Sequence, residues 1–376
     1  MVSAVLFITF FVLLVLNVPI AVCLGLSSAA AILYSGTSLT IVATNIYSGI
    51  SKFLLLAIPF FVLSGNIMAK AGISTRLIRF VDTCVGHRKG GIANVCIIVA
   101  CFFGAISGSG PATVAALGAV LIPAMIERGG FSAAFSTALM ATSSSIAIVI
   151  PPSIAFVVYA SITGVSIGDM FMAGIIPGIL MGLALVVVVM LEVRRNHVVP
   201  SNVEKASAKE RWNAFKDAFW GFLMPVIILG GIYGGIFTPT EAAAVSVVYG
   251  LFVGMVIYKE VKFKDLWEIL IDSAKTTGGI MLIVACASLF SFVCTRFGIS
   301  TAASELLARV AGNQFTFLLI CNIIFLIAGC FIDANSAMYI FIPIMLPVCK
   351  ALGYNVIAFG IMATVNLAIG QVTPPV

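Results

Sequence analysis

Two pairs of short polar segments interrupt long apolar stretches of the chain, and their side chains are of the types that hold ions. Residues 104–112 read GAISGSGPA, and residues 329–338 read GCFIDANSAM. Each is followed by a second break that ends in Pro-Pro, TSSSIAIVIPPS at 142–153 and TVNLAIGQVTPPV at 364–376. Hydroxyl, carboxylate and backbone carbonyl oxygens suit a hard cation such as sodium, whereas the N–H groups of a helix N-terminus suit an anion.

The candidate site residues form two sets, one in each half of the chain. In the first half, the residues predicted to contact sodium or substrate are Ser107, Gly108, Ser109, Gly110, Ser143, Ser144, Ser145, Pro151 and Ser153. In the second half they are Asp333, Asn335, Ser336, Asn366, Gly370, Thr373 and Pro374. Because Ser and Thr also line close helix contacts in membranes, we expect about half of the serines to touch an ion or the substrate.

Asp333 is the most informative single residue, because it is the only charged side chain between Arg309 and Lys350. A carboxylate inside a membrane is costly unless it is paired or bound to a cation, so Asp333 is predicted to contribute to an ion site. The alternative is a helix N-cap at the tip of a hairpin, a position that favours Asp. The two roles are compatible.

Two other charged residues allow a prediction. Arg296 stands just before a Gly-Ile-Ser sequence, where it either extends to the membrane interface or helps to attract an anion. Glu241, in TPTEAAAV at 238–245, fits the cap or first turn of a helix.

The composition predicts a multi-pass membrane protein. The chain is 61% hydrophobic and 9% charged, whereas soluble domains average about 25% charged residues. The net charge of +6 lies mainly in a few loops, so it indicates topology and not nucleic-acid binding. The N-terminus is apolar from its start and is predicted to be a retained span, and the nine cysteines fit small apolar residues.

An all-α fold with two inverted repeats follows from the positions of the breaks and the basic loops. We predict a first repeat at 1–193, a basic cytoplasmic linker at 194–216 and a second repeat at 217–376. Landmarks in the two halves recur at offsets between 220 and 226 residues. They are Pro19 with Pro239, residues 72–74 with 298–300, Pro123 with Pro347, and Pro151-Pro152 with Pro374-Pro375.

Each repeat is predicted to hold a re-entrant helical hairpin and a discontinuous helix. The hairpins are placed at about 91–126 and 315–349, with arms of about 15 residues or roughly 22 Å, too short for a hydrocarbon core of roughly 30 Å. Gly108, Gly110 and Pro111 are expected outside the helices. The broken helices are placed at about 131–164 and from about 354 onward.

With these residues in view, the chain resembles the large membrane (M) subunit of tripartite ATP-independent periplasmic (TRAP) transporters. The resemblance covers essentially the whole chain. It is carried by GAISGSGPATVAALGAVLIPAM at 104–125, SSSIAIVIPPS at 143–153, FTPTEAAAV at 237–245, and DANSAM with the terminal GQVTPPV. The N-terminal segment LFITFFVLLVLNVPIAV is most similar to the sialic-acid branch.

The resemblance implies a sodium-coupled elevator in the bacterial inner membrane that takes up an organic acid such as sialic acid. One sodium site would lie between the first hairpin tip and the 143–153 break, and a second between the Asp333 tip and the 366–373 loop. The implied partners are a small membrane (Q) subunit and a periplasmic substrate-binding (P) protein. The chain stops where the first half continues for about forty residues more, so we expect the second broken helix to be incomplete.

The sequence fits several alternatives less well. A serine hydrolase needs a base near the serine, yet both histidines lie in basic loops and no lysine lies in either hairpin. A channel needs a continuous polar path, and a passive anchor would not need so many breaks. C4-dicarboxylate TRAP transport and a single-component sodium–dicarboxylate symporter of similar hairpin architecture remain as alternatives. No nucleotide motif is found, so an ion gradient is expected to drive transport.

Overall fold

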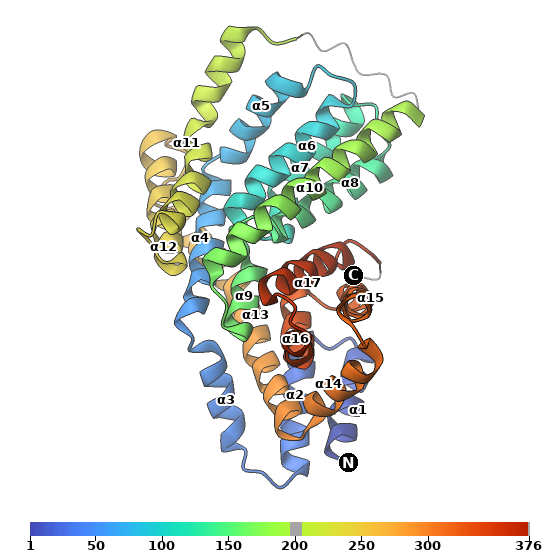
Figure 1. Ribbon diagram of the computed structural model, residues 1–376. Helices are drawn as coiled ribbons and strands as arrows, with labels where there is room; N and C mark the ends of the chain where they lie inside the picture. The colour runs from blue at the N-terminus through green and yellow to red at the C-terminus, as the bar shows by residue number, and fades with distance from the viewer. Residues whose placement is uncertain (196–204, 375–376) are drawn as a thin grey trace. The chain divides into compact units, whose positions relative to one another are not determined.

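The structure is a computed structural model that describes residues 1–195 and 205–374 (Figure 1). Every regular element in these ranges is a helix, which confirms the predicted all-α class. Residues 196–204 of the predicted linker, and Pro375 and Val376 of the last break, lie outside the described residues. The remainder of the predicted linker is largely helical, because α10 (Ile167–Arg195) runs to Arg195 and α11 (Ala208–Tyr233) begins at Ala208.

The chain divides into two compact units, each of which draws on both halves of the sequence. The first unit comprises residues 1–56, 155–170 and 275–376, and the second comprises 57–154 and 171–274. The first-half hairpin therefore belongs to the second unit, and the second-half hairpin belongs to the first unit.

The second unit is built around the first hairpin, α6 and α7, which packs against α8. The helix α5 packs against both α6 and α11, and α4 packs against α12. Its helices are α4 (Ala57–Lys70), α5 (Ile73–Val85), α6 (Gly91–Ser107), α7 (Gly110–Glu127), α8 (Ala133–Ser145), η2 (Ile146–Ile148), most of α10, α11, α12 (Pro239–Phe252), the π-helical turn η3 (Val253–Ile257) and the start of α13 (Asp265–Arg296). Glu241 completes a capping box with Thr238 at the start of α12, as the sequence predicts.

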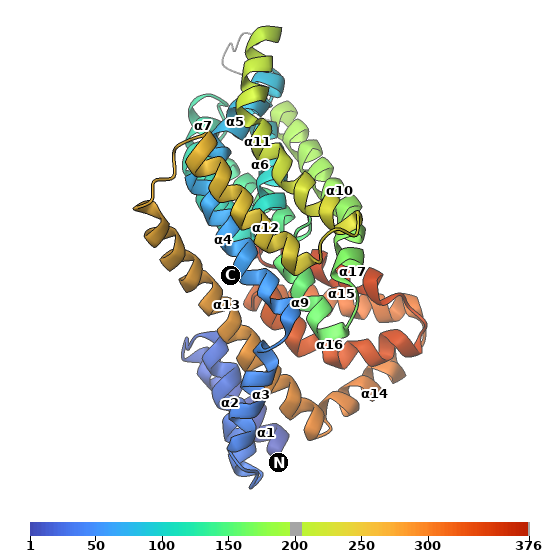
Figure 2. The ribbon, with the colours of Figure 1, turned by 90° about the vertical axis from the view of Figure 1, so that its left-hand side faces the viewer.

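The first unit contains the second hairpin, α15 and α16, against which α14 and α17 pack (Figure 2). Its helices are α1 (Val2–Val15), α2 (Ile20–Tyr34), α3 (Thr40–Ile50), η1 (Phe53–Leu56), nearly all of α9 (Ile154–Thr163), the rest of α13, α14 (Ile299–Ala311), α15 (Gln314–Phe331), α16 (Ala334–Ala351) and α17 (Val356–Gly370). The predicted N-terminal span, α1, has 14 residues and pairs with α2.

The hairpin arms are longer than the sequence predicts. The helix α6 has 17 residues, and α7, α15 and α16 have 18 each. The first correction concerns Gly110 and Pro111, which form the first turn of α7, where a proline loses no helical hydrogen bond. Eight described helices are long and apolar enough to cross a membrane, and α7, α15 and α16 are among them. Helix length therefore does not exclude a full crossing, and the re-entrant depth of the hairpins stays a prediction.

Candidate ion and substrate sites

The first hairpin turns through two residues at its tip. Gly108 ends α6 in the left-handed conformation, with φ of 61°, and Ser109 is extended before α7. The Thr113 hydroxyl donates to the Ser109 carbonyl at 2.8 Å and lies 3.1 Å from Ser107 Oγ. The single hydroxyl proton of Thr113 is donated to the Ser109 carbonyl. Ser107 Oγ is therefore the donor in the hydrogen bond between the Ser107 and Thr113 hydroxyls. Thr113 is fully buried and was not predicted from the sequence.

The tip lies directly against the break that follows α8. A Cβ atom added at Gly108 would lie 2.7 Å from the carbonyl oxygen of Pro152, and the Ile154 N–H donates to the Gly108 carbonyl at 3.4 Å. A Cβ atom at Gly110 would lie 3.3 Å from the Ser144 carbonyl. The tip thus brings backbone carbonyls of the break close to the Ser107–Ser109 turn, and only a glycine permits this approach.

The serines of the first-half break are buried, and the protons of Ser144 and Ser145 are used locally. Ser144 Oγ donates to the Ala141 carbonyl at 2.7 Å, and Ser145 Oγ donates to the Thr142 carbonyl at 2.8 Å. A hydroxyl that donates its one proton keeps lone pairs that can accept or ligate a cation. The Ser143 hydroxyl is buried without a nitrogen or oxygen partner in the described chain.

The other first-half candidates occupy the same break. Ser153 is fully buried, and its hydroxyl donates to the Ile148 carbonyl at 2.5 Å. Pro151 is also buried, whereas Ser109 is half-buried at the tip. The structure therefore gathers all nine first-half candidates on the hairpin tip and the break beside it.

The second hairpin turns at Asp333, which caps α16. Its Oδ2 accepts hydrogen bonds from the backbone N–H groups of Asn335 at 3.0 Å and Ser336 at 3.2 Å. Its Oδ1 accepts a hydrogen bond from the Ser336 hydroxyl at 2.5 Å. The capping role considered for Asp333 is therefore observed. A carboxylate has about four acceptor positions, so these three bonds leave room for a cation.

Amide side chains supply further oxygen atoms among the second-half candidates and their neighbours. The Asn366 Nδ2 atom donates to Asn322 Oδ1 at 2.6 Å and to the Met362 carbonyl at 2.8 Å, so both of its N–H groups are used. The remaining capacity of this amide is as an acceptor. Asn335 Oδ1 is buried and has no hydrogen-bond partner among the described residues. Asn322 was not predicted, although an Asn within an apolar helix is a signal of its own.

Small residues let the two hairpins approach the neighbouring helix ends closely. A Cβ atom at Gly104 would lie 2.7 Å from the Ala147 Cα, and one at Gly370 would lie 2.6 Å from the Gly329 Cα. Gly104 and Gly329 are 225 residues apart, and Ala147 and Gly370 are 223 apart. The same close contact therefore recurs at corresponding positions of the two halves.

The remaining predicted residues are exposed. Thr373 is exposed, and its hydroxyl donates to the Ile369 carbonyl at 3.0 Å. Pro374 is exposed too. Arg296 is the exposed last residue of α13, and no hydrogen bond or ion pair is found between it and Asp333 or Asn366 in the described chain. A role of Arg296 in attracting an anion therefore stays a prediction.

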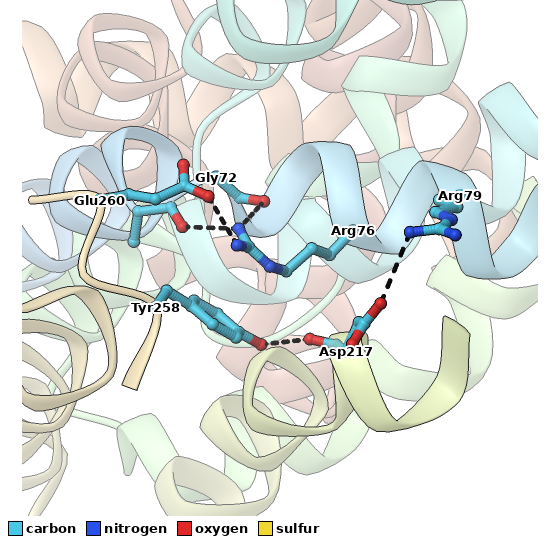
Figure 3. Close-up of polar contacts among 7 residues, drawn as sticks. Gly72, Arg76, Arg79, Asp217, Tyr258 and Glu260 are labelled. Carbon is cyan, nitrogen blue, oxygen red and sulfur yellow. Dashed lines mark hydrogen bonds and ion pairs between the residues drawn. The ribbon is translucent and has the colours of Figure 1, made fainter. Parts of the chain in front are cut away.

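A separate charged cluster in the second unit ties α5 to its neighbours (Figure 3). The Arg76 guanidinium donates to Glu260 at 2.6 Å and lies 3.9 Å from the centre of the Tyr258 ring. The Tyr258 hydroxyl donates to the Asp217 carbonyl at 2.5 Å, and Arg79 lies 3.6 Å from the Asp217 carboxylate. Burial raises the pKa of Tyr258 to about 12, which keeps this donor protonated.

The charges in this cluster balance, although its residues line a cavity of about 440 Å³. Each arginine faces a carboxylate, so the arrangement fastens helix ends together and leaves no net charge for a ligand. We refer to it below as the charged clamp, comprising Arg76, Arg79, Asp217, Tyr258 and Glu260.

Known proteins match this chain over almost its whole length. The family described as "Tripartite ATP-independent periplasmic transporter, DctM component" matches residues 7–376. A C4-dicarboxylate TRAP transporter large permease protein of Pseudomonas aeruginosa is 42% identical over 94% of this chain and 82% of its own length, and one of Rhodobacter capsulatus is 38% identical over 97% and 86%. An isethionate TRAP transporter permease protein of Oleidesulfovibrio alaskensis is 40% identical over 99% of this chain and 58% of its own length.

These relatives are permeases and not enzymes, and the described chain holds eight helices able to span a bilayer. The chain therefore belongs to the DctM family, the large membrane subunits of TRAP transporters in the bacterial inner membrane.

Proposed function

We propose that this subunit carries an organic anion into the cell together with sodium ions, which bind at the two hairpin tips. The observation that carries the proposal is the repeated arrangement of a hairpin tip, a close glycine contact and a neighbouring helix end rich in oxygen atoms. Two or more sodium ions would supply the driving force, because the sequence contains no nucleotide-binding motif.

The first sodium site is proposed at the tip of α6 and α7. Ser107 and Ser145 offer hydroxyl lone pairs, since their protons are used in local hydrogen bonds. The Ser144 and Pro152 carbonyls lie close to the glycines of the same tip. Neutral oxygens of this kind replace the hydration shell of a hard cation without a fixed negative charge.

The second sodium site is proposed around Asp333. The carboxylate supplies charge, and the unpartnered oxygen of Asn335 supplies a further ligand. Asn366 can only accept, because both of its N–H groups are used. Gly370, Thr373 and Pro374 would contribute backbone from the end of α17.

An inverted repeat and an elevator mechanism are proposed on the same basis. The helices α7 and α16 both have 18 residues and begin 224 residues apart, at Gly110 and Ala334. The paired contacts of Gly104 and Gly329 recur at similar offsets. Inverted repeats give a transporter two related states. When the two repeats exchange conformations, a site that was open to the outside becomes open to the inside.

Two substrate classes are proposed. The N-terminal segment favours sialic acid, whereas the names of the similar proteins favour a C4-dicarboxylate or a small sulfonate. In either case the substrate is an anion. A periplasmic binding protein would deliver it, and a small membrane subunit would brace the chain.

The test is uptake by the full complex reconstituted in liposomes with a candidate binding protein and small subunit. Labelled succinate, isethionate and N-acetylneuraminate are supplied with and without an inward sodium gradient. We expect one of these anions to accumulate only with both sodium and the binding protein. Uptake that needs no binding protein would instead support a single-component symporter, and uptake that ignores sodium would contradict ion coupling.

A further inference from the structure

We propose that Lys52, with Ser161 and Tyr339, forms a subsite for the acidic group of the transported anion. The inference rests on the proposed function, since it assumes that the chain carries an anion. All three residues belong to the first unit, where they come from the segment before η1, from α9 and from α16. None of them belongs to the predicted site sets.

The three residues are joined by short hydrogen bonds. Lys52 Nζ donates to the Ser161 carbonyl at 2.7 Å, and the Ser161 and Tyr339 hydroxyl oxygens lie 3.0 Å apart. Ser161 Oγ donates its only proton to the Val158 carbonyl at 2.7 Å. Tyr339 is therefore the donor to Ser161. These hydrogen bonds hold the Tyr339 ring in one position, beside the end of α9 to which Lys52 is bonded.

The Lys52 ammonium keeps unused capacity for a negatively charged group. It has three N–H donors, of which one is used by Ser161. No salt bridge to Lys52 is found in the described chain, whereas Lys70, Arg76 and Arg128 are each paired with a carboxylate. The two free donors can make charge-assisted hydrogen bonds to a carboxylate or sulfonate oxygen.

The surroundings strengthen this attraction. Ser161 and Tyr339 are 8% and 4% exposed, so the ammonium stands at the edge of a buried polar pair and remains accessible itself. Partial burial lowers the pKa of Lys52. A bound anion would raise the pKa of Lys52 again, because a nearby negative charge favours the charged ammonium.

The position of Tyr339 connects this subsite with the proposed second sodium site. Tyr339 follows Asp333 by six residues on α16, which is about 9 Å along the helix axis. One rigid helix therefore carries the carboxylate for the cation at its start and a hydroxyl of the anion subsite in its second turn. A substrate bound at Lys52 and a sodium ion bound at Asp333 would both hold α16 in the same position.

The competing explanation is that Lys52 only caps a helix. The Ser161 carbonyl lies in the last turn of α9, where a positive charge is favourable. A cap would contribute to stability and leave the affinity for the anion unchanged. Measuring affinity and stability separately distinguishes the two roles.

The experiment uses the reconstituted complex and whichever of succinate, isethionate and N-acetylneuraminate the natural chain transports. We compare Lys52→Met, Lys52→Arg and Tyr339→Phe with the control Lys350→Met, which removes a lysine near the other end of α16 in the same unit. Loss of a charge-assisted hydrogen bond should raise KM about tenfold or more in Lys52→Met. Half-saturating sodium should stay within about twofold, Lys52→Arg should recover most of the affinity, and Tyr339→Phe should show a smaller rise in KM.

An unchanged KM in Lys52→Met, with the natural chain active, would overturn the subsite alone. Failure of the natural chain to transport any of the anions would overturn the proposed function, and the subsite with it. If Lys52→Met proves less stable, the rise in Tm caused by the anion at saturating sodium is measured on purified complex. If Lys52→Met no longer shows this rise in Tm, the subsite is supported. If the rise in Tm remains, the subsite is overturned.

Discussion

The tips of the two hairpins make similar turns, but the groups that surround each turn differ in charge. Between α6 and α7 the chain turns at Gly108 and Ser109, and the oxygen atoms that contact the turn among the described residues are neutral. Between α15 and α16 it turns at Ile332 and Asp333, and the helix is capped by a carboxylate. Under the proposed function, sodium would be held by many weak ligands at the first tip and by one charge at the second.

The two tips also differ in how they tolerate change. Both hairpins have a close backbone contact just before the tip, at Gly104 and at Gly329. The first tip also brings Gly108 against the carbonyl of Pro152, so a glycine is required there. At the second tip side chains carry the contacts, through Asp333 and Ser336. Substitutions should therefore affect geometry at the first tip and charge at the second.

The largest effect is expected for Asp333→Asn. Asn is as good an N-cap as Asp, so folding should survive. The lost charge removes the main electrostatic compensation for a cation in a low-dielectric site, so sodium-coupled uptake should be abolished. Uptake in liposomes and Tm of the purified protein are measured together. Near-normal uptake by a folded Asp333→Asn protein would reduce this residue to a cap and remove the contrast between the tips.

The next largest effect is expected for Gly108→Ala. The added Cβ would lie 2.7 Å from the Pro152 carbonyl, in a residue with φ of 61°. The control is Gly353→Ala, which has φ of 67° but no atom within 4 Å of the added Cβ. Backbone strain alone should cost each variant about 1 kcal/mol.

Only Gly108→Ala should also lose most of its uptake, because the tip must move away from the break. Thermal unfolding and uptake separate the two contributions. Equal losses of uptake in both variants would mean that strain, and not the contact with Pro152, is what matters at the tip.

A graded effect is expected for Ser145→Ala and Ser107→Ala. Each removes one neutral ligand of several, so half-saturating sodium should rise about three- to tenfold and uptake should recover at higher sodium. Ser28→Ala is the matched control, because its buried hydroxyl also donates within its own helix, to the Leu24 carbonyl at 2.6 Å. Loss of transport with an unchanged sodium dependence would identify these serines as packing residues.

Much of this arrangement could be predicted from the sequence, because the breaks are marked by residues with strong local effects. Gly108, Pro111 and Asp333 mark helix ends here, and the expected hairpins at 91–126 and 315–349 lie within two residues of the observed helix limits. Helix lengths were underestimated because Gly110 and Pro111 are tolerated in a first turn.

The rest depends on contacts between residues that are distant in the sequence. Asn322 becomes informative only when it is found beside Asn366, and Lys52 only when its ammonium is found on the Ser161 carbonyl, 109 residues away. A lone lysine or asparagine in an apolar chain has many possible partners, and local pattern does not choose among them. Arg296 is exposed at the end of α13, so its suggested part in attracting an anion stays a prediction.

The smallest effect is expected for the charged clamp, which lies outside both tips. Arg76→Ala removes the bond to Glu260 and the contact with the Tyr258 ring, so it should lower the free energy of unfolding by about 1 to 2 kcal/mol. Glu260→Gln keeps the contact between Arg76 and the Tyr258 ring, so it should lower the free energy of unfolding by less than about 1 kcal/mol. Because the carboxylate is partly exposed, the difference between Glu260→Gln and the natural chain should shrink at high salt.

Sodium dependence should be unchanged in both variants, since neither touches a tip. Thermal unfolding at low and high salt, with sodium titrations of uptake, gives both readings. A shift in half-saturating sodium in Arg76→Ala, at unchanged anion affinity, would show that the clamp influences ion binding. The contrast between a neutral tip and a charged tip would then be incomplete as an account of where sodium affinity is set.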